Sequence, residues 1–352
     1  MVQNADKDYN AYFQDVPPGV KHQAIVWLQK QCMEKAKRLP AEFDTLEEWE
    51  AFRDKVCREL PDLIGIPKLP PLKPSRIRAR FQVGEDVLGE LVDVYADDDY
   101  SIPAYLFLPL ERPQGKLSAL IFSPGWNQGK WIKSYQMFAV RMAKQGFAVM
   151  ILDHAPFGET APQDREPVFN MSLTMELCSL LGYSQMGLRV AETLRCMEYM
   201  LSRPDIDPER IALSGLCQGG MDTWFAGALE PRFAAVAPLC SATTFAIHAA
   251  EQASYRSNAD ASPFPHGILN LCDVDHLHEM IAPRPLMVRG NLGDDWWPMS
   301  GYDTLEARTK KVYALYNAQD KVDFRMEVNE HDLTNQFADA LEAFLLRYLK
   351  AE

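Results

Sequence analysis

The chain has 352 residues, of which 47% are hydrophobic, so it is long enough for one large globular domain with additions or for two smaller domains. Its 36 Lys and Arg residues against 49 Asp and Glu residues give a formal net charge of −13, which argues against a nucleic-acid or anionic-membrane partner. The N-terminus, MVQNADKDYN, lacks the basic and apolar regions of a secretory signal, and no apolar run approaches the ~20 residues that span a bilayer, so we expect a cytoplasmic protein.

The seven cysteines are odd in number and none has the CxxC spacing. Neither a disulfide framework nor a structural zinc site is therefore predicted. We expect six of them to be small buried side chains in a reducing compartment, with Cys217 as the exception.

The N-terminal part of the chain predicts a small helical extension. Residues 20–60 carry apolar side chains at helical spacing. Residues 61–75, PDLIGIPKLPPLKPS, hold too many prolines for a helix or a central strand and indicate an extended linker. We therefore divide the chain into an extension over 1–75 and a catalytic domain over 76–352.

From Arg76 onward the chain alternates between short apolar runs typical of strands and longer segments typical of helices. Helices are predicted over residues 132–145, about 184–202, from 218, about 303–317 and 334–349. Such alternation predicts an α/β fold with a mostly parallel sheet and helices on both faces. The first three strands are joined by short turns, so we expect them to form an antiparallel edge.

A glycine-rich turn with a cysteine follows one of the predicted strands. Residues 215–219, Gly-Leu-Cys-Gln-Gly, have the form G-x-nucleophile-x-G between a strand and a helix, which is the context of a nucleophile elbow. Side chains in place of Gly215 and Gly219 would collide with neighbouring elements in so sharp a turn. Because the helix N-terminus favours thiolate over thiol, we predict that Cys217 is a nucleophile and not a structural cysteine.

A nucleophile of this kind needs a base and an acid that orients the base, and with this elbow they follow in the order nucleophile, acid, base. His331 lies just after the last predicted strand and is the predicted base. Asp294 and Asp295 are adjacent after the preceding strand. We predict Asp294 as the acid and keep Asp295 as the alternative.

The negative charge that develops on an attacked carbonyl oxygen needs two N–H donors. One is expected from Gln218, the residue after the nucleophile. The other is expected from the loop FSPGWNQGK, residues 122–130, where we assign it to Trp126.

These motifs together resemble the α/β-hydrolases over residues 76–350, and within them the dienelactone hydrolase and acetyl xylan esterase-like group. The resemblance rests on SPGWNQG, LDHAPFGET, RPDIDPERIALSGLCQGG, HLHEMIAPRPLMVRGNLGDDWWP and NEHDLT. Dienelactone hydrolases carry Cys in a GxCxGG turn, as here, whereas acetyl xylan esterase-like members usually carry Ser. Dienelactone hydrolases also have a glutamate in the oxyanion loop, which this chain lacks. The resemblance implies an α/β-hydrolase fold that needs no metal or organic cofactor.

An insertion and several aromatic or imidazole side chains are candidates for the substrate site. Residues 241–270 are too long for a simple connection and are expected to form a lid or insertion over the site. The residues predicted to contact substrate are His154, Phe245, His248, Trp296 and Trp297. For His154, packing within its loop is favoured over contact with substrate. For Trp296 and Trp297, packing in the core is an equal alternative.

Residues 273–280, DVDHLHEM, contain Asp, His and Glu side chains that could bind a metal. However, His276 and His278 are two residues apart, so on a helix they point in different directions. We therefore expect a structural helix there. Ser184 is expected to cap a helix and not to act as a nucleophile.

The predicted activity is hydrolysis of a carboxylic ester or lactone through a thioester on Cys217. An acyltransferase and a carbon–carbon bond hydrolase are alternatives on the same fold, and a non-catalytic binding protein is an alternative of another class. The expected partner is a small ester, lactone or acyl compound. The sequence does not determine the oligomeric state, and a homodimer is one option.

Overall fold

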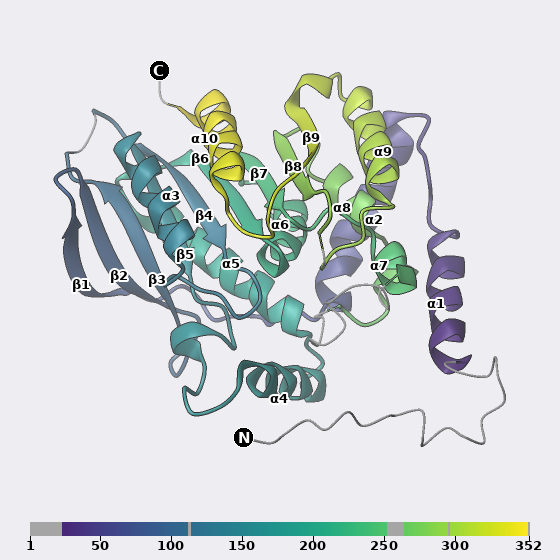
Figure 1. Ribbon diagram of the computed structural model, residues 1–352, viewed down its shortest axis with the longest axis horizontal. Helices are drawn as coiled ribbons and strands as arrows, with labels where there is room; N and C mark the ends of the chain where they lie inside the picture. Colours follow the sequence, from purple (N-terminus) through teal and green to yellow (C-terminus); the bar gives the residue numbers. More distant parts are fainter. Residues whose placement is uncertain (1–22, 112–113, 252–263, 295, 351–352) are drawn as a thin grey trace.

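The computed structural model describes residues 23–111, 114–251, 264–294 and 296–350 and contains one nine-stranded sheet (Figure 1). The strands are β1 (Arg76–Val83), β2 (Val87–Tyr95), β3 (Ser101–Pro109), β4 (Leu117–Ser123), β5 (Phe147–Leu152), β6 (Ile206–Leu216), β7 (Ala235–Leu239), β8 (Leu286–Asn291) and β9 (Val322–Glu327). The helices are α1 (Gln23–Ala36), α2 (Leu46–Leu63), α3 (Lys133–Lys144), α4 (Pro167–Leu180), α5 (Gln185–Ser202), α6 (Gln218–Leu229), α7 (Phe245–Glu251), α8 (Val274–Glu279), α9 (Tyr302–Leu315) and α10 (Asn335–Leu349). Single 3-10 turns are η2 (Gly158–Thr160), η5 (Ile268–Asn270) and η6 (Gln319–Lys321).

The strand order is β1-β2-β3-β5-β4-β6-β7-β8-β9. Strands β1, β2 and β3 pair antiparallel, β3 pairs antiparallel with β5, and all pairs from β4 to β9 are parallel. The predicted antiparallel edge and parallel sheet are therefore confirmed. In the parallel part, Ser123 pairs with Gly215 and Leu216 with Leu239, so the loops that follow β4, β6 and β7 meet at one edge.

Helices cover both faces of the sheet, and each face has its own apolar core. Helices α3 and α10 lie on the face that Figure 1 shows in front, with buried Phe138 and Phe337 among their contacts with the sheet. On the opposite face the core joins α2, α5, α6, α8 and α9, with Trp49, Val190 and Trp224 among its fully buried side chains. Burial on both faces explains why most of the parallel strands read as continuous apolar runs.

Two predicted boundaries differ from the structure. Helix α2 continues through Pro61 to Leu63, so the extended linker begins later than the proline pattern indicates. Helix α4 lies in a stretch for which the sequence predicts no helix. Its apolar side chains point in several directions, including the exposed Phe169 and Leu177, so the segment has no helical period to detect.

The start of α5 is capped as predicted and is also tied to the end of α2. The Ser184 hydroxyl accepts a hydrogen bond from the Gly187 N–H (2.8 Å) and donates one to the Ile64 carbonyl (2.6 Å). A Cβ on Gly187 would lie 2.4 Å from the Ile64 and Gly65 carbonyl oxygens, so the two helices meet backbone to backbone. None of the helices described is long and apolar enough to cross a membrane.

Candidate active site

Cys217 stands alone between the end of β6 and the start of α6, with φ 60° and ψ −117°. A non-glycine residue rarely adopts this conformation, which lifts the side chain out of the turn. A Cβ on Gly215 would lie 2.3 Å from the Gly219 carbonyl oxygen, and one on Gly219 would lie 1.9 Å from the Ser123 carbonyl oxygen. The steric reason predicted for the two glycines is thus present in the structure.

The structure brings His331 and Asp294 together. Nδ1 of His331 lies 2.8 Å from Oδ2 of Asp294, whose side chain is fully buried. The other carboxylate oxygen accepts hydrogen bonds from the backbone N–H groups of Trp296 (2.8 Å) and Trp297 (3.3 Å). The alternative acid, Asp295, lies outside the described residues.

The thiol and the imidazole shift each other's pKa. Burial raises the pKa of the Cys217 thiol, but the charge of His331 and hydrogen bonds with His331 and the Trp297 side chain outweigh burial and bring the pKa below its ordinary value. Burial lowers the pKa of His331, but the thiolate of Cys217 and the hydrogen bond with Asp294 raise it to about 10. Asp294 holds Nδ1 of His331, which leaves Nε2 for proton exchange with the thiol. The arrangement favours a thiolate–imidazolium pair.

The loop after β4 approaches the elbow closely. A Cβ on Gly125 would lie 3.2 Å from the carbonyl oxygen of Leu216, and the N–H of Gly125 donates to the side chain of Gln128 (3.2 Å). Among the described residues, no hydrogen bond uses the backbone N–H of Trp126 or of Gln218. Both N–H groups are therefore free to act as the predicted oxyanion donors.

The predicted pocket residues lie at different depths. Trp297 is 5% exposed and its ring lies 5.0 Å from that of His248, whereas the ring of Trp296 lies 6.1 Å from that of His331. His248 and Phe245 are buried, and the two nitrogens of His248 have no partner in the described structure. Burial lowers the pKa of His248 to about 4. Contact of Phe245, His248 and the two tryptophans with a substrate stays a prediction.

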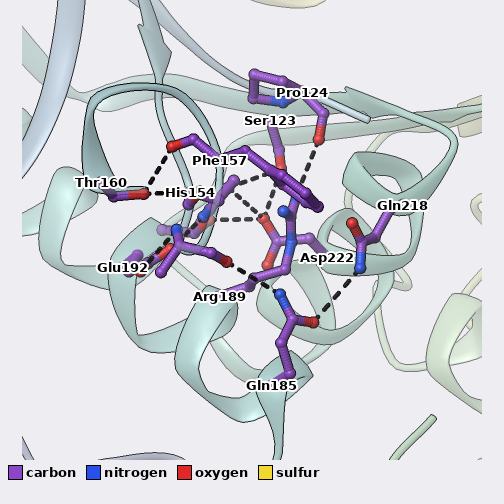
Figure 2. Close-up of polar contacts among 12 residues, drawn as sticks. Ser123, Pro124, His154, Phe157, Thr160, Gln185, Arg189, Glu192, Gln218 and Asp222 are labelled. Atoms are coloured by element: carbon purple, nitrogen blue, oxygen red, sulfur yellow. Dashed lines mark hydrogen bonds and ion pairs between the residues drawn. The ribbon is translucent and has the colours of Figure 1, made fainter. Parts of the chain in front are cut away.

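The assignment of His154 to the substrate pocket is corrected by the structure. Its Nδ1 faces the Glu192 carboxylate (2.5 Å), and its Nε2 faces Ser123 Oγ (2.9 Å) and the Asp222 carboxylate (3.1 Å), as Figure 2 shows for this buried cluster. His154 is 1% exposed, so neither nitrogen is left for a substrate.

This cluster contains residues that the sequence analysis missed. Gln185, Arg189, Glu192 and Thr193 lie on one face of α5 at helical spacing and are all buried. Polar residues on the buried face of a helix are unusual unless they are hydrogen bonded. Their spacing was the signal that could have revealed them.

Two groups of side chains have the types of donor atom that bind metals. Residues 274–279 form α8 as expected, with Asp273 and His276 in a capping box, while His278 packs on Trp224 and Phe324. Donor atoms of Cys240, Asp294 and His331 also lie within 4.8 Å of one another. Asp294 and His331 already bind each other and Asp294 accepts two backbone N–H groups, so these atoms have partners without a metal ion.

A cavity of about 750 Å³ lies beside the oxyanion loop. Its lining includes Asn127, Lys130, Trp131, Phe157, Glu159 and Asn170. Trp126 packs against Phe157 at its edge, with ring centroids 5.6 Å apart. The cavity combines aromatic faces with polar groups beside the loop that follows β4.

Comparison with known proteins finds a protein family and a relative that this chain resembles. Residues 45–320 match the Abhydrolase family. "Putative hydrolase YtaP" of Bacillus subtilis (strain 168) is 25% identical over 279 residues, covering 75% of this chain and 88% of that protein.

Solved structures resemble the chain at lower identity. Methylesterase BT1017 has a TM-score of 0.70 at 20% identity, over 90% of this chain and 68% of that one. A glucuronoyl esterase from Solibacter usitatus has a TM-score of 0.62 at 16% identity, over 83% and 91%. An acetyl xylan esterase from Paenibacillus sp. R4 has a TM-score of 0.54 at 16% identity, over 90% and 99%. These likenesses concern the fold.

Proposed function

The chain belongs to the Abhydrolase family and has the α/β-hydrolase fold predicted from its sequence, and on that premise we propose that it is a carboxylic-ester hydrolase whose nucleophile is Cys217. The observation that carries the proposal is the pairing of His331 with Asp294 at 2.8 Å beside a thiol whose pKa is lowered. The esterase names of the structural neighbours support the choice of esters. The GxCxGG turn supports the finer, dienelactone hydrolase-like assignment and extends the substrates to lactones.

The reaction proceeds in two halves. The Cys217 thiolate attacks the ester carbonyl carbon, and the N–H groups of Trp126 and Gln218 bind the oxygen that becomes negative. Collapse of this intermediate breaks the carbon–oxygen bond, and His331 donates its proton to the leaving alcohol. A thioester on Cys217 remains.

Water completes the cycle. His331 removes a proton from water, which attacks the thioester carbonyl, and the carbon–sulfur bond breaks to release the acid and the thiolate. Asp294 holds the imidazole in one orientation and stabilises its charged form. The same thioester could pass its acyl group to an alcohol or amine, which is the acyltransferase alternative.

The experiment is hydrolysis of p-nitrophenyl acetate by the parent chain, by Cys217→Ala and by Cys217→Ser, with Cys57→Ala as a control at an exposed thiol. We expect Cys217→Ala to abolish turnover, Cys217→Ser to keep its fold and lose most activity, and the control to match the parent. Mass spectrometry of the quenched parent should find one acetyl group on the peptide that contains Cys217. Full activity of Cys217→Ala would refute the proposal.

Product analysis separates the remaining alternatives. An acyltransferase would form a new ester when a second alcohol is added, and a carbon–carbon hydrolase would cleave a β-diketone. A non-catalytic binding protein would show no turnover with any of these compounds.

A further inference from the structure

We infer that Arg189 is a positioning residue that holds the oxyanion loop in register with the nucleophile elbow. The inference rests on the proposed function, because it concerns how the two oxyanion donors are kept in place. Oxyanion donors act only within about 2.7–3.1 Å of the oxygen that they stabilise, so a small shift of the loop would lower the rate of acylation.

Arg189 is fully buried on α5 and reaches the loop directly (Figure 2). Its Nη2 donates to the Pro124 carbonyl (2.8 Å) and lies 3.4 Å from Ser123 Oγ. Pro124 is two residues before Trp126, which supplies one of the proposed donors. The guanidinium therefore fixes the peptide from which the donor loop departs.

The same network reaches the other side of the oxyanion site. The Ser123 hydroxyl donates to Oδ2 of Asp222 (2.7 Å), and Asp222 lies on α6, five residues after Cys217. Thr193 of α5 donates to the same oxygen (2.7 Å). The loop and the helix that begins with the second donor, Gln218, are thus linked through one set of hydrogen bonds.

The packing leaves little room for these parts to move separately. The Ser123 carbonyl lies where a Cβ of Gly219 would be, at 1.9 Å, and the Pro124 carbonyl lies 2.7 Å from the same point. A change in the path of residues 123–124 therefore acts directly on the first turn of α6.

Burying a charged guanidinium is energetically unfavourable. Arg189 Nε and Nη1 have no partner in the part of the chain described, and burial lowers the pKa of Arg189. Buried charges of this kind are often no more stabilising than apolar side chains of similar size. Its bonds to Pro124 and Ser123 give the charge a use that a packing residue would not have.

The test compares two reactions of Cys217 that differ in their need for the oxyanion hole. Acylation by p-nitrophenyl acetate forms an oxyanion, whereas alkylation by iodoacetamide displaces iodide and forms none. The rate of the first acylation and the rate of alkylation are measured for the parent and for four variants: Arg189→Met, Arg189→Lys, Ser123→Ala and Ser214→Ala. Ser214 is the matched control, because it is a buried serine on the adjoining strand whose hydroxyl bonds the Ala237 carbonyl (2.7 Å).

We expect Arg189→Met to lower the ratio of acylation to alkylation by roughly 10²-fold, the scale of losing one oxyanion donor. Ser123→Ala should lower it about tenfold and Arg189→Lys should restore part of the loss, while Ser214→Ala leaves the ratio within about twofold. If Arg189→Met does not fold, Ser123→Ala against Ser214→Ala decides.

A ratio that stays at the parental value in the folded variants, even with both rates reduced, would overturn the positioning role and leave the proposed function intact. Absence of an acetyl group on Cys217 of the parent would instead remove the proposed function and the inference together.

Discussion

Single residues at the elbow owe their chemistry to their surroundings. Cys217 is one of seven cysteines, and its pKa is lowered by an imidazole that is itself held by a buried carboxylate. Burial raises the pKa of the other buried thiols, Cys196, Cys240 and Cys272 among them. The contrast makes reactivity a direct probe of the site.

Iodoacetamide should therefore label Cys217 at lower pH than Cys57, which is exposed but has a raised pKa, mainly through partial burial. Because only the thiolate reacts, the labelling rate rises as the pH passes the pKa of each thiol, so the difference should be largest near neutral pH. Peptide mapping after brief labelling measures it. Equal labelling of the two peptides at pH 7 would contradict the assignment of Cys217.

Asp294→Asn should lower turnover by roughly 10²- to 10⁴-fold, because an amide cannot stabilise the charged imidazole. It should also move the alkaline limit of the pH–rate profile down, since the hydrogen bond with Asp294 raises the pKa of His331. Asp332→Asn is the matched control, because that carboxylate neighbours His331 in the chain but bonds Ser134 (3.1 Å).

Comparable losses in the two variants would argue against a specific role for Asp294. A larger loss in Asp295→Asn would transfer the role of the acid to its neighbour.

At the scale of elements, the sequence predicts those helices, strands and turns that a local pattern of residues defines. The strand-turn-helix around Cys217 was predictable because two glycines and a strand pattern define it. Helix α4 was not, because it lacks a polar–apolar period, and the end of α2 was misplaced because Pro61 is tolerated inside its last turns. The buried polar face of α5 depends on partners from the loops that follow β4 and β5 and from α6, which only the folded chain brings together.

Gly219→Ala tests the contact between β4 and α6. The added Cβ would meet two backbone carbonyl oxygens that cannot rotate away, so we expect a loss of roughly 3 kcal/mol in the free energy of unfolding, as for severe overpacking. Gly146→Ala is the control, because its Cβ would meet open space and the cost, about 1–2 kcal/mol, comes from its positive φ alone. Urea denaturation measures both. Equal losses would show that the close approach is not restrictive.

At the scale of the whole molecule, stability depends on histidines that stay neutral inside it. His278 is fully buried, neither ring nitrogen has a partner in the described structure, and burial lowers its pKa to about 3. In the unfolded chain the pKa returns to about 6.5. Between about pH 6.5 and pH 3 the imidazole of His278 is therefore protonated in the unfolded chain but not in the folded one. As the pH falls through this range, His278 lowers the free energy of unfolding.

His278→Phe should remove that dependence. Relative to the parent, its free energy of unfolding should rise by about 2 kcal/mol between pH 7 and pH 5. Urea unfolding at several pH values measures the difference, and His266→Phe, at an exposed histidine, should run parallel to the parent. A parallel course for His278→Phe as well would show that its pKa is not depressed.

The N-terminal helices pack against parts of the chain that come much later. Arg53 of α2 bonds Tyr316, 263 residues further on, and His276 bonds the Pro40 carbonyl across 236 residues. At a synthesis rate of 5–20 residues per second, the partners of α2 leave the ribosome on the order of tens of seconds after it. During that interval the apolar side chains of Trp49, Val56 and Leu60, all fully buried in the finished fold, lack the later helices α6 and α9 that complete their burial. Helix α2 is therefore fully covered only after later segments such as α9 have been made.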